Sequence, residues 1–454
     1  MRPMNILGLG IRPPPQAAGN PAVTPELLAS CCARYSRSNK GIDAILASID
    51  KSDPDRSVDS IFRFVDYGHA SIAGMTGGIA MVIDGCSMFL AYKLFELAQL
   101  ADGQESSTRY IKLDASSLPD ARDVGIPEQL AEEWKACLAL AFEIYRESYA
   151  TLSRAAEETP AIVRIPAGAD AKIAERLRKN YALDRCRYLI PFATRTNAAL
   201  VMNARAWGET VKQLDSLPLP EAHACAQGLR RELAKFVPRL IRHSDPDEAS
   251  IFQAKFAIDA AIGRIRRAGV PSVHLADECA LGVENGFPWF FPSNQAIGDA
   301  FAGKSGRYSA VGPAVRRVMV RASWNNMAIA ELRDLNRHRT GFRQSPLVPV
   351  GFYLPPGVAH EKLAAFLSAQ RSLVAKLAAR EIGGGAYVYG LLLGTQVEFE
   401  HSTHLDKFIY EIELRTGLGA HFRYAEHLTA AYRELVKRMP ELIPYVNIGT
   451  AEPE

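Results

Sequence analysis

The stretch GGIAMVIDGCSMFLAYKLFELAQLAD, residues 77–102, changes its hydrophobic pattern in the middle. Up to Ser87 the residues alternate in a way that is typical of a β-strand, whereas Leu90, Leu94 and Leu97 recur at helical spacing. The stretch therefore predicts a strand that passes directly into a helix. The polar segment GQESSTRY, residues 103–110, follows as an expected turn.

The second half of the chain repeats this order. VRRVMVRASWNNMAIAELRDLNRHR, residues 315–339, again reads as a strand and then a helix, and ends in a polar motif. A long helical stretch, an apolar strand and another helix follow in each half; the long helical stretches are residues 127–180 and about 359–380. This weak repeat of roughly 200 residues is too long for a solenoid unit and indicates two copies of one domain. We predict an α+β fold with domains at 1–245 and 246–454, joined at the charged segment IRHSDPDEA.

Composition excludes several classes of protein. The 454 residues are 48% hydrophobic and carry a net charge of only +3, which does not indicate binding to nucleic acid or membranes. The seven cysteines form no C-x-x-C pair and predict neither a disulfide framework nor a zinc ribbon. The N-terminal apolar run is too short for a signal peptide, and no apolar run approaches the ~20 residues of a membrane span. We expect a cytoplasmic protein.

Three adjacent side chains, Arg337, His338 and Arg339, form the most conspicuous charged motif. Such residues commonly end a helix because they interact favourably with its negative dipole end. They could equally clamp a phosphate or another anion, since arginine offers paired donors of fixed geometry. The residues alone leave both interpretations open.

Other candidates have equally ordinary alternatives. Glu105, Ser107 and Arg109 fit a capped turn or a site for a hydroxylated, phosphorylated ligand. Arginines beside strands, such as Arg187, are usually surface charges, and Arg415 fits a helix-surface pair with Glu411 four residues earlier. The two histidines of EHSTH, residues 400–404, lack the H-E-x-x-H pattern or a nearby cysteine, and we predict no metal site.

Taken together, the motifs resemble those of the flavin-dependent thymidylate synthases. In the first half the resemblance rests on four segments: YGHASI (67–72), GQESSTRY (103–110), RCRYLIP (185–191) and NARAW (203–207). In the second half it rests on RHRT (337–340) and HLDKFIYEIELRTGLGAHFRYAEHL (404–428). The order and spacing of these motifs cover most of the chain, which resembles two fused, diverged copies of a domain that normally occurs singly.

The departures from the family signature are complementary. When Tyr110 is placed on the signature tyrosine, the R-H-R positions of the first half become Leu97, Ala98 and Gln99. In the second half R-H-R is kept, and the E-x-S-x-R positions become Ser345, Leu347 and Pro349. The resemblance therefore implies a pseudo-dimer with one composite site per chain, because the reciprocal site has lost its ligand-binding groups.

The resemblance also implies roles for individual residues. The substrate-binding residues would be Glu105, Ser107, Arg109, Arg187, Arg337 and Arg415. Arg415, the one catalytic residue in this assignment, would favour the N3-deprotonated uracil ring. The flavin-binding residues would be His69, Ser71, Glu105, Asn203, Arg205, Arg337, His338 and Arg339. The second flavin-side asparagine of the family is Glu209 here, which places a carboxylate near the flavin diphosphate.

The activity implied is a methyltransferase reaction that converts dUMP to dTMP. The family uses FAD, with methylenetetrahydrofolate and NADPH as co-substrates, and a homodimer of this chain would reproduce its four-domain assembly. Two alternatives remain open at this point. The acceptor could be another pyrimidine nucleotide, or the chain could be a non-catalytic nucleotide- or flavin-binding scaffold.

Overall fold

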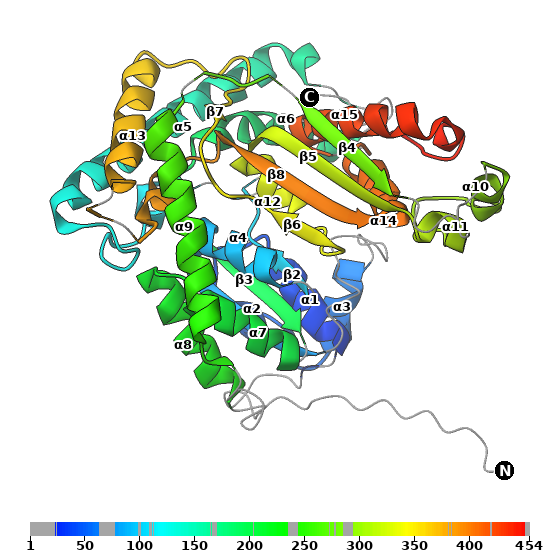
Figure 1. The fold of residues 1–454 in the computed structure, drawn as a ribbon, viewed down its shortest axis with the longest axis horizontal. Coiled ribbons are helices and arrows are strands. Elements are labelled where there is room, and N and C mark those ends of the chain that lie inside the picture. The colour runs from blue at the N-terminus through cyan, green and yellow to red at the C-terminus, as the bar shows by residue number, and fades with distance from the viewer. Residues whose placement is uncertain are drawn as a thin grey trace. The chain divides into compact units, whose positions relative to one another are not determined.

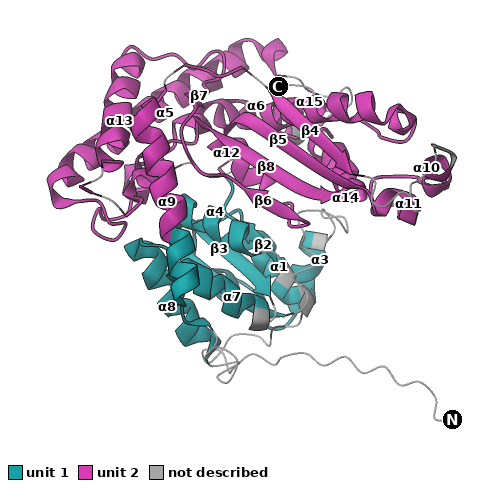
Figure 2. Cartoon of the chain, in the orientation of Figure 1, with its two compact units in different colours: residues 1–107, 195–254 teal, residues 108–194, 255–454 magenta. Residues whose placement is uncertain are grey.

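The computed structural model describes residues 23, 25–62, 78–98, 101–108, 111, 113–163, 165, 170–202, 204–234, 244–271, 273–276, 278–284, 294–379, 381–382, 384–417 and 420–449 (Figure 1). Two compact units divide the chain, and neither is continuous in sequence (Figure 2). Unit 1 contains residues 1–107 and 195–254, and unit 2 contains residues 108–194 and 255–454. No helix in the described part of the chain is long and apolar enough to span a membrane.

Unit 1 consists of a small sheet with helices. Its elements are α1 (Pro25–Tyr35), α2 (Ile42–Ala47), α3 (Pro54–Phe62), β1 (Ile79–Ser87), α4 (Met88–Leu97), β2 (Asp102–Glu105), β3 (Arg195–Met202), α7 (Ala204–Asp215) and α8 (Pro220–Leu233). The strands pair antiparallel in the order β1-β3-β2. Helix α9 (Glu248–Ala268) begins in unit 1 and continues into unit 2.

The predicted change from strand to helix at Ser87 is confirmed. Strand β1 ends at Ser87, whose hydroxyl oxygen accepts a hydrogen bond from the backbone N–H of Leu90 and so caps α4. The predicted turn after α4 is wrong for its first residues, because Gly103 to Glu105 pair with β3 as part of β2. A Cβ on Gly103 would lie 2.4 Å from the carbonyl oxygen of Ala199, so glycine permits this close pairing.

Unit 2 contains the larger sheet, in the order β4-β5-β8-β6, and β7 also pairs with β8. Its helices are α5 (Glu128–Glu158), α6 (Ala171–Cys186), α10 (Asn294–Ala300), α11 (Pro313–Arg316), α12 (Ile329–Leu335), α13 (Leu363–Leu377), α14 (Leu405–Arg415) and α15 (Phe422–Arg438). Its short 3₁₀ segments are η2 (Ala115–Ser117), η3 (Pro160–Ile162), η4 (Arg187–Leu189), η7 (Ala386–Gly390) and η8 (Pro440–Leu442). Its strands are β4 (Cys279–Glu284), β5 (Met319–Ala328), β6 (Phe342–Gln344), β7 (Gly351–Phe352) and β8 (Thr395–His404).

The two sheets are built from the same order of elements. In unit 1, β1 leads into α4 and β2, and β3 leads into α7; in unit 2, β5 leads into α12 and β6, and β8 leads into α14. Each central pair has a register shift, between Ile83 and Cys86 in β1 and between Trp324 and Met327 in β5. The α+β class is confirmed, and the repeated order is the one that the internal repeat predicts.

Residues 108–194 of the first half pack within unit 2. Pro191 forms an antiparallel bridge with Leu392, flanked by hydrogen bonds from Phe192 N–H to the Leu391 carbonyl (2.8 Å) and from Leu393 N–H to the Ile190 carbonyl (2.9 Å). The indole N–H of Trp134, in α5, donates to the carbonyl of Tyr389 at 2.9 Å. These contacts hold η4, which carries Arg187, against second-half segments.

The long helix predicted over residues 127–180 is two helices. Helix α5 ends at Glu158, and the 3₁₀ segment η3 begins at Pro160 before α6 starts at Ala171. Proline lacks an amide hydrogen and fixes its φ angle, so it cannot continue the helix. The break matters for the site, because α6 ends at Cys186 and the next residue, Arg187, is the first of η4.

Candidate functional site

The Arg337-His338-Arg339 motif follows the end of helix α12. The helix ends at Leu335 and all three side chains are half-buried in the turn beyond it. The chain then reverses at Gly341, whose φ is +89° and where a Cβ would lie 2.0 Å from the carbonyl oxygen of Ser402. Only glycine tolerates this left-handed conformation and close approach, and the turn fixes the motif beside strand β8.

Arg415 reaches the motif from the C-terminal end of α14. Its Nε donates a hydrogen bond to Nε2 of His338 at 2.7 Å, and its Nη2 donates to the backbone carbonyl of Asp334 at 3.1 Å. The second contact satisfies a carbonyl in the last turn of α12, where a cation is favoured by the helix dipole. The structure therefore brings together Arg415 and His338, two residues that the sequence assigns to one site.

Arg187 joins the same group from the first half of the sequence. Its side chain is only 2% exposed, its Nη1 lies 3.2 Å from a carboxylate oxygen of Asp334, and its Nη2 lies 3.7 Å from Glu331. Glu331 and Asp334 are three residues apart in α12 and so lie on one face of that helix. We call the six residues the arginine–carboxylate cluster: Arg187, Glu331, Asp334, Arg337, His338 and Arg415.

Asp334 is the shared anion of the cluster. Arg337 also lies 3.9 Å from its carboxylate. Burial alone would raise the pKa of Asp334, but the guanidinium groups of Arg187, Arg337 and Arg415 outweigh it and lower the pKa to about 2. Asp334 is therefore ionised throughout the physiological pH range.

His338 is neutral in the cluster. Its Nε2 accepts the hydrogen bond from Arg415, so the ring proton must be on Nδ1. Burial lowers the pKa of His338 to about 3, and Arg415 adds to this effect against the opposing charge of Glu411. The imidazole holds the arginine in place without adding positive charge.

Glu331 is the cluster's titratable group near neutral pH. Its side chain is fully buried, and the phenol of Tyr188 donates a hydrogen bond to one of its carboxylate oxygens. Burial raises the pKa of Glu331 to about 7, in spite of the opposing effect of Arg187. A substantial fraction of this carboxyl group is therefore protonated at neutral pH.

We expect the Glu331→Gln substitution to change how stability depends on pH. The pKa of Glu331 is higher in the folded chain (about 7) than its ordinary 4.5, so the stabilisation that its proton provides is complete below pH 4.5 and is lost as the pH rises to about 7. Glutamine removes this loss. Relative to wild type, the variant should gain about 1.4 kcal/mol per pH unit over that interval, measured by urea unfolding. Glu132→Gln, on the exposed face of α5, is the control, and an equal slope in both variants would contradict the assignment.

His401 and Glu411 form a buried pair beside Thr340, the residue that follows the motif. Nδ1 of His401 lies 2.9 Å from Glu411, and its Nε2 lies 2.9 Å from the carbonyl oxygen of Thr340, which requires a proton on Nε2. Burial alone would raise the pKa of Glu411, but His401 and Arg415 hold it below its ordinary value. The alternative interpretation of Arg415, a surface pair with Glu411, is wrong, because the helix face that carries Glu411 packs against β8 and leaves this side chain 1% exposed.

Aromatic rings surround the arginines. The Arg415 guanidinium carbon lies 5.3 Å from the ring centre of Tyr424, and that of Arg423 lies 4.4 Å from the ring centre of Tyr353. The rings of Tyr353 and Tyr188 meet edge to face at 4.9 Å. Flat apolar rings beside fixed guanidinium groups suit a planar, hydrogen-bonding heterocycle.

The remaining predicted residues lie outside this cluster or outside the described chain. Glu105 is a buried residue at the end of β2 in unit 1, and the backbone N–H of Ser107 donates to the carbonyl of Ser36 at 2.8 Å. Arg339 follows His338 in the half-buried turn. His69, Ser71, Arg109 and Asn203 lie outside the described residues, and Arg205 is in α7 with its side chain outside them. Glu209 is exposed on α7 and accepts a hydrogen bond from Gln213 at 2.6 Å.

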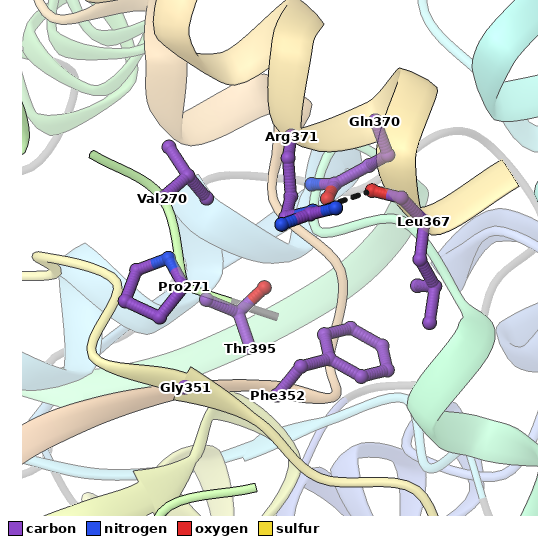
Figure 3. A pocket seen from close by; sticks show the side chains of 8 residues that line it. All are labelled: Val270, Pro271, Gly351, Phe352, Leu367, Gln370, Arg371 and Thr395. Carbon is purple, nitrogen blue, oxygen red and sulfur yellow. Dashed lines mark hydrogen bonds between the residues drawn. The ribbon is translucent and has the colours of Figure 1, made fainter. Parts of the chain in front are cut away.

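A small pocket in unit 2 contains no member of the cluster (Figure 3). Its polar side chains already have backbone partners: Arg371 donates to the carbonyl of Leu367 at 3.3 Å, and Gln370 donates to that of Gly390 at 2.6 Å. The other lining residues are Val270, Pro271, Gly351, Phe352 and Thr395. The pocket is therefore a largely apolar gap and not the candidate site.

The chain is thus an α+β protein in which three arginines, two carboxyl groups and one histidine from the two sequence halves form one cluster. Residues 22–239 match the family described as thymidylate synthase complementing protein. The family predicted from the motifs is thus confirmed. The chain is also similar to the UPF0159 protein Ta1429 of Thermoplasma acidophilum, with 23% identity over 492 aligned residues that cover 92% of this chain and 94% of the relative.

Proposed function

We propose that the chain catalyses a flavin-dependent, thymidylate synthase-like methylation at C5 of a uracil ring. The match of residues 22–239 to the thymidylate synthase complementing protein family supports the reaction class. The observation that carries the proposal is the convergence of Arg187, from the first half, with His338 and Arg415, from the second half, in one cluster of unit 2. By family resemblance the carbon donor is methylenetetrahydrofolate, the reductant is NADPH and the acceptor is dUMP.

Arg415 has the geometry to act on the uracil ring. Its guanidinium is held in place by His338 and by the end of α12, yet the side chain remains half-buried and not fully enclosed. A fixed positive charge at the uracil edge favours the deprotonated, electron-rich ring that attacks the carbon donor. Because the neutral His338 only accepts its hydrogen bond, it does not offset the charge of Arg415.

The residues beyond α12 suit a flavin diphosphate. Arg337 and Arg339 place two half-buried guanidinium groups in the turn that Gly341 fixes, and paired arginine donors bind phosphate oxygens well. Glu209, the residue that departs from the family pattern, is exposed and accepts a hydrogen bond from Gln213 of the same helix. This contact gives Glu209 a structural role within α7. When bound, FAD would supply the hydride chemistry, and the protein would supply orientation and charge.

We further propose that the two sequence halves form a pseudo-dimer and that two chains assemble into a homodimer. Glu105, Ser107, Arg109, Asn203 and Arg205 keep the roles that the family resemblance predicts for them. The positions that lost their polar groups fit an abandoned second site, since Ala98 and Leu347 are buried apolar residues in the structure. Such an enzyme would act in nucleotide biosynthesis in the cytoplasm.

A different pyrimidine acceptor is the second candidate. The observation in its favour is that Arg187, assigned by resemblance to the dUMP phosphate, is already paired with Asp334 and Glu331. A flavin- or nucleotide-binding scaffold without turnover is the remaining alternative, and it would bind ligands at the same cluster.

The visible spectrum of the full chain reconstituted with FAD tests the proposal. We expect a bound-flavin spectrum that shifts saturably when a uracil nucleoside or nucleotide is added, because flavin and pyrimidine share the site. Release of tritium from C5 of the labelled pyrimidine would then establish turnover. Absence of FAD binding would refute the proposed enzyme activity. Binding of FAD and pyrimidine without tritium release would instead support the non-catalytic scaffold.

A further inference from the structure

A buried ion pair lies at the last turn of helix α14. Lys304 and Glu413 approach each other to 2.5 Å, and their side chains are only 6% and 3% exposed. The same carboxylate oxygen of Glu413 accepts a hydrogen bond from the backbone N–H of Asn447 at 2.9 Å, and the Lys304 ammonium donates to the backbone carbonyl of Tyr445 at 2.9 Å. The ion pair thus connects residues 445–449, which we call the C-terminal strap, to α14.

The C-terminal strap also contacts the residue that follows Arg415. The backbone N–H of Gly449 donates to the hydroxyl of Thr416 at 3.0 Å, and this hydroxyl donates to the carbonyl of Ile412 at 2.7 Å, in the last turn of α14. A Cβ on Gly449 would lie 2.4 Å from the carbonyl oxygen of Thr416, so only glycine permits this close approach. Arg415 therefore lies between two residues, Glu413 and Thr416, that the strap contacts.

The other contacts of the C-terminal strap are with α10 and the residues that follow it. The rings of Tyr445 and Phe301 stack with their centres 4.8 Å apart and an interplanar angle of 4°. A Cβ on Gly298, in α10, would lie 3.0 Å from the hydroxyl of Tyr445, and Val446 is buried. The strap is therefore packed on one side against α10 and on the other against the end of α14.

We propose that the C-terminal strap positions Arg415, and that Gly449 is the residue that allows the strap to reach the helix. Arg415 is the last residue of α14, and helices fray at this end because the last carbonyl groups lack intrahelical partners. By holding Glu413 and Thr416, the strap keeps the last turn ordered, so that the guanidinium stays beside His338. The inference rests on the proposed function for the reaction in which Arg415 acts.

Hydrogen exchange of the wild-type chain tests the contacts. We expect the backbone amides of Asn447 and Gly449 to be protected, because they donate to buried groups of α14 and the turn after it. The amides of Thr416 and Gly417, which donate to carbonyls of the last turn, should be protected as well. This measurement needs no variant. Exchange of the strap amides at the rate of an unstructured peptide would overturn the proposal.

The Gly449→Ala variant tests the positioning role. The added Cβ does not fit against Thr416, so the strap should detach while every residue of the arginine–carboxylate cluster is unchanged. We expect the amides of Thr416 and Gly417 to exchange at least tenfold faster. Turnover per bound flavin should fall about tenfold, because a misplacement of about 1 Å can reduce a rate by up to about 10²-fold.

Turnover is expressed per bound flavin because chains that fail to fold bind no flavin and are then not counted. A loss of fold alone would leave turnover per bound flavin unchanged. The control is Gly306→Ala, where a Cβ would meet no atom within 4 Å. Equal exchange and equal turnover in the two variants would contradict the proposal.

The Thr416→Val variant tests the same contact from the side of the helix. Valine keeps the β-branched shape but removes the hydroxyl that accepts the hydrogen bond from Gly449. We expect a similar loss of turnover per bound flavin. The double variant with Gly449→Ala should lose little more than either single variant, because both substitutions remove one contact. Losses that multiply would show that the two residues act independently and would contradict the proposal.

The outcomes separate this inference from the proposed function. A wild-type chain without FAD binding or tritium release would refute the proposed function. The exchange of Thr416 and Gly417 would still decide whether the strap orders the end of α14, since faster exchange in Gly449→Ala supports it and unchanged exchange overturns it. A wild-type chain that turns over, with an unchanged rate per bound flavin in Gly449→Ala, would support the flavoenzyme and refute the positioning role.

Discussion

Replacing Arg187 by methionine should destabilise the protein by about 3–5 kcal/mol, which is the usual cost of removing one partner from a buried ion pair. Arg187 is 2% exposed and is the guanidinium shared by Asp334 and Glu331. Methionine has a similar length, so the loss comes mainly from the carboxylates that remain without their cation. Urea unfolding at pH 7, followed by circular dichroism, measures the change.

The matched control for this substitution is Arg122→Met. Arg122 also contacts an aspartate, Asp120, but its side chain is 89% exposed. Exposed pairs of this kind contribute only about 0–1 kcal/mol. Similar losses in the two variants would contradict a buried electrostatic role for Arg187. The cost of Arg187→Met should also fall when Glu331 is glutamine, because one of the stranded carboxyl groups is then neutral.

Replacing Arg415 by alanine should reduce turnover by about 10²–10³-fold, the effect of removing one fixed electrostatic group from an active site. Arg415 is the cation that α12 and His338 hold at the end of α14. The fold should persist, because the groups it leaves are half-buried and water can replace its hydrogen bonds. The measurement is tritium release from C5 of the pyrimidine, together with an unfolding curve of the same variant.

Arg438→Ala is the control for Arg415. Arg438 ends α15 and is exposed, so its loss removes the same charge from a helix terminus outside the cluster. Equal turnover by the two variants would show that Arg415 does not act in catalysis. Loss of turnover together with loss of the folded state would instead mark Arg415 as a structural residue.

The local elements of the fold could be predicted from the sequence because their signals are local. The strand that becomes a helix at Ser87 is visible as a change of hydrophobic period, and the structure shows the serine cap that fixes the boundary. The pairing of Gly103 to Glu105 with β3 could not be predicted in the same way. A polar segment becomes a strand there because a partner strand about a hundred residues later accepts it, and short-range patterns do not report such partners.

The motifs predict which cationic residues of the cluster come together, but they do not predict the partners of its carboxylates. Arg337, His338 and Arg415 are brought together as the motifs imply. The carboxylates of Glu331 and Asp334 are visible at helical spacing just before the motif, but their partner Arg187 is 147 residues from Asp334. The burial of Glu411 could not be predicted for a similar reason, because its partner His401 lies on the strand against which its helix packs. Sequence spacing shows which residues share one face of a helix, but it does not show which strand or helix packs against that face.

The bridge between Pro191 and Leu392 makes the two halves of the chain inseparable. A fragment that ended near residue 245 would keep α5, α6 and η4 but would lose the second-half backbone to which Trp134, Ile190 and Phe192 are hydrogen-bonded. The complementary fragment would lose Arg187, the guanidinium that faces both Glu331 and Asp334. Neither half of the sequence therefore has an intact interior of its own.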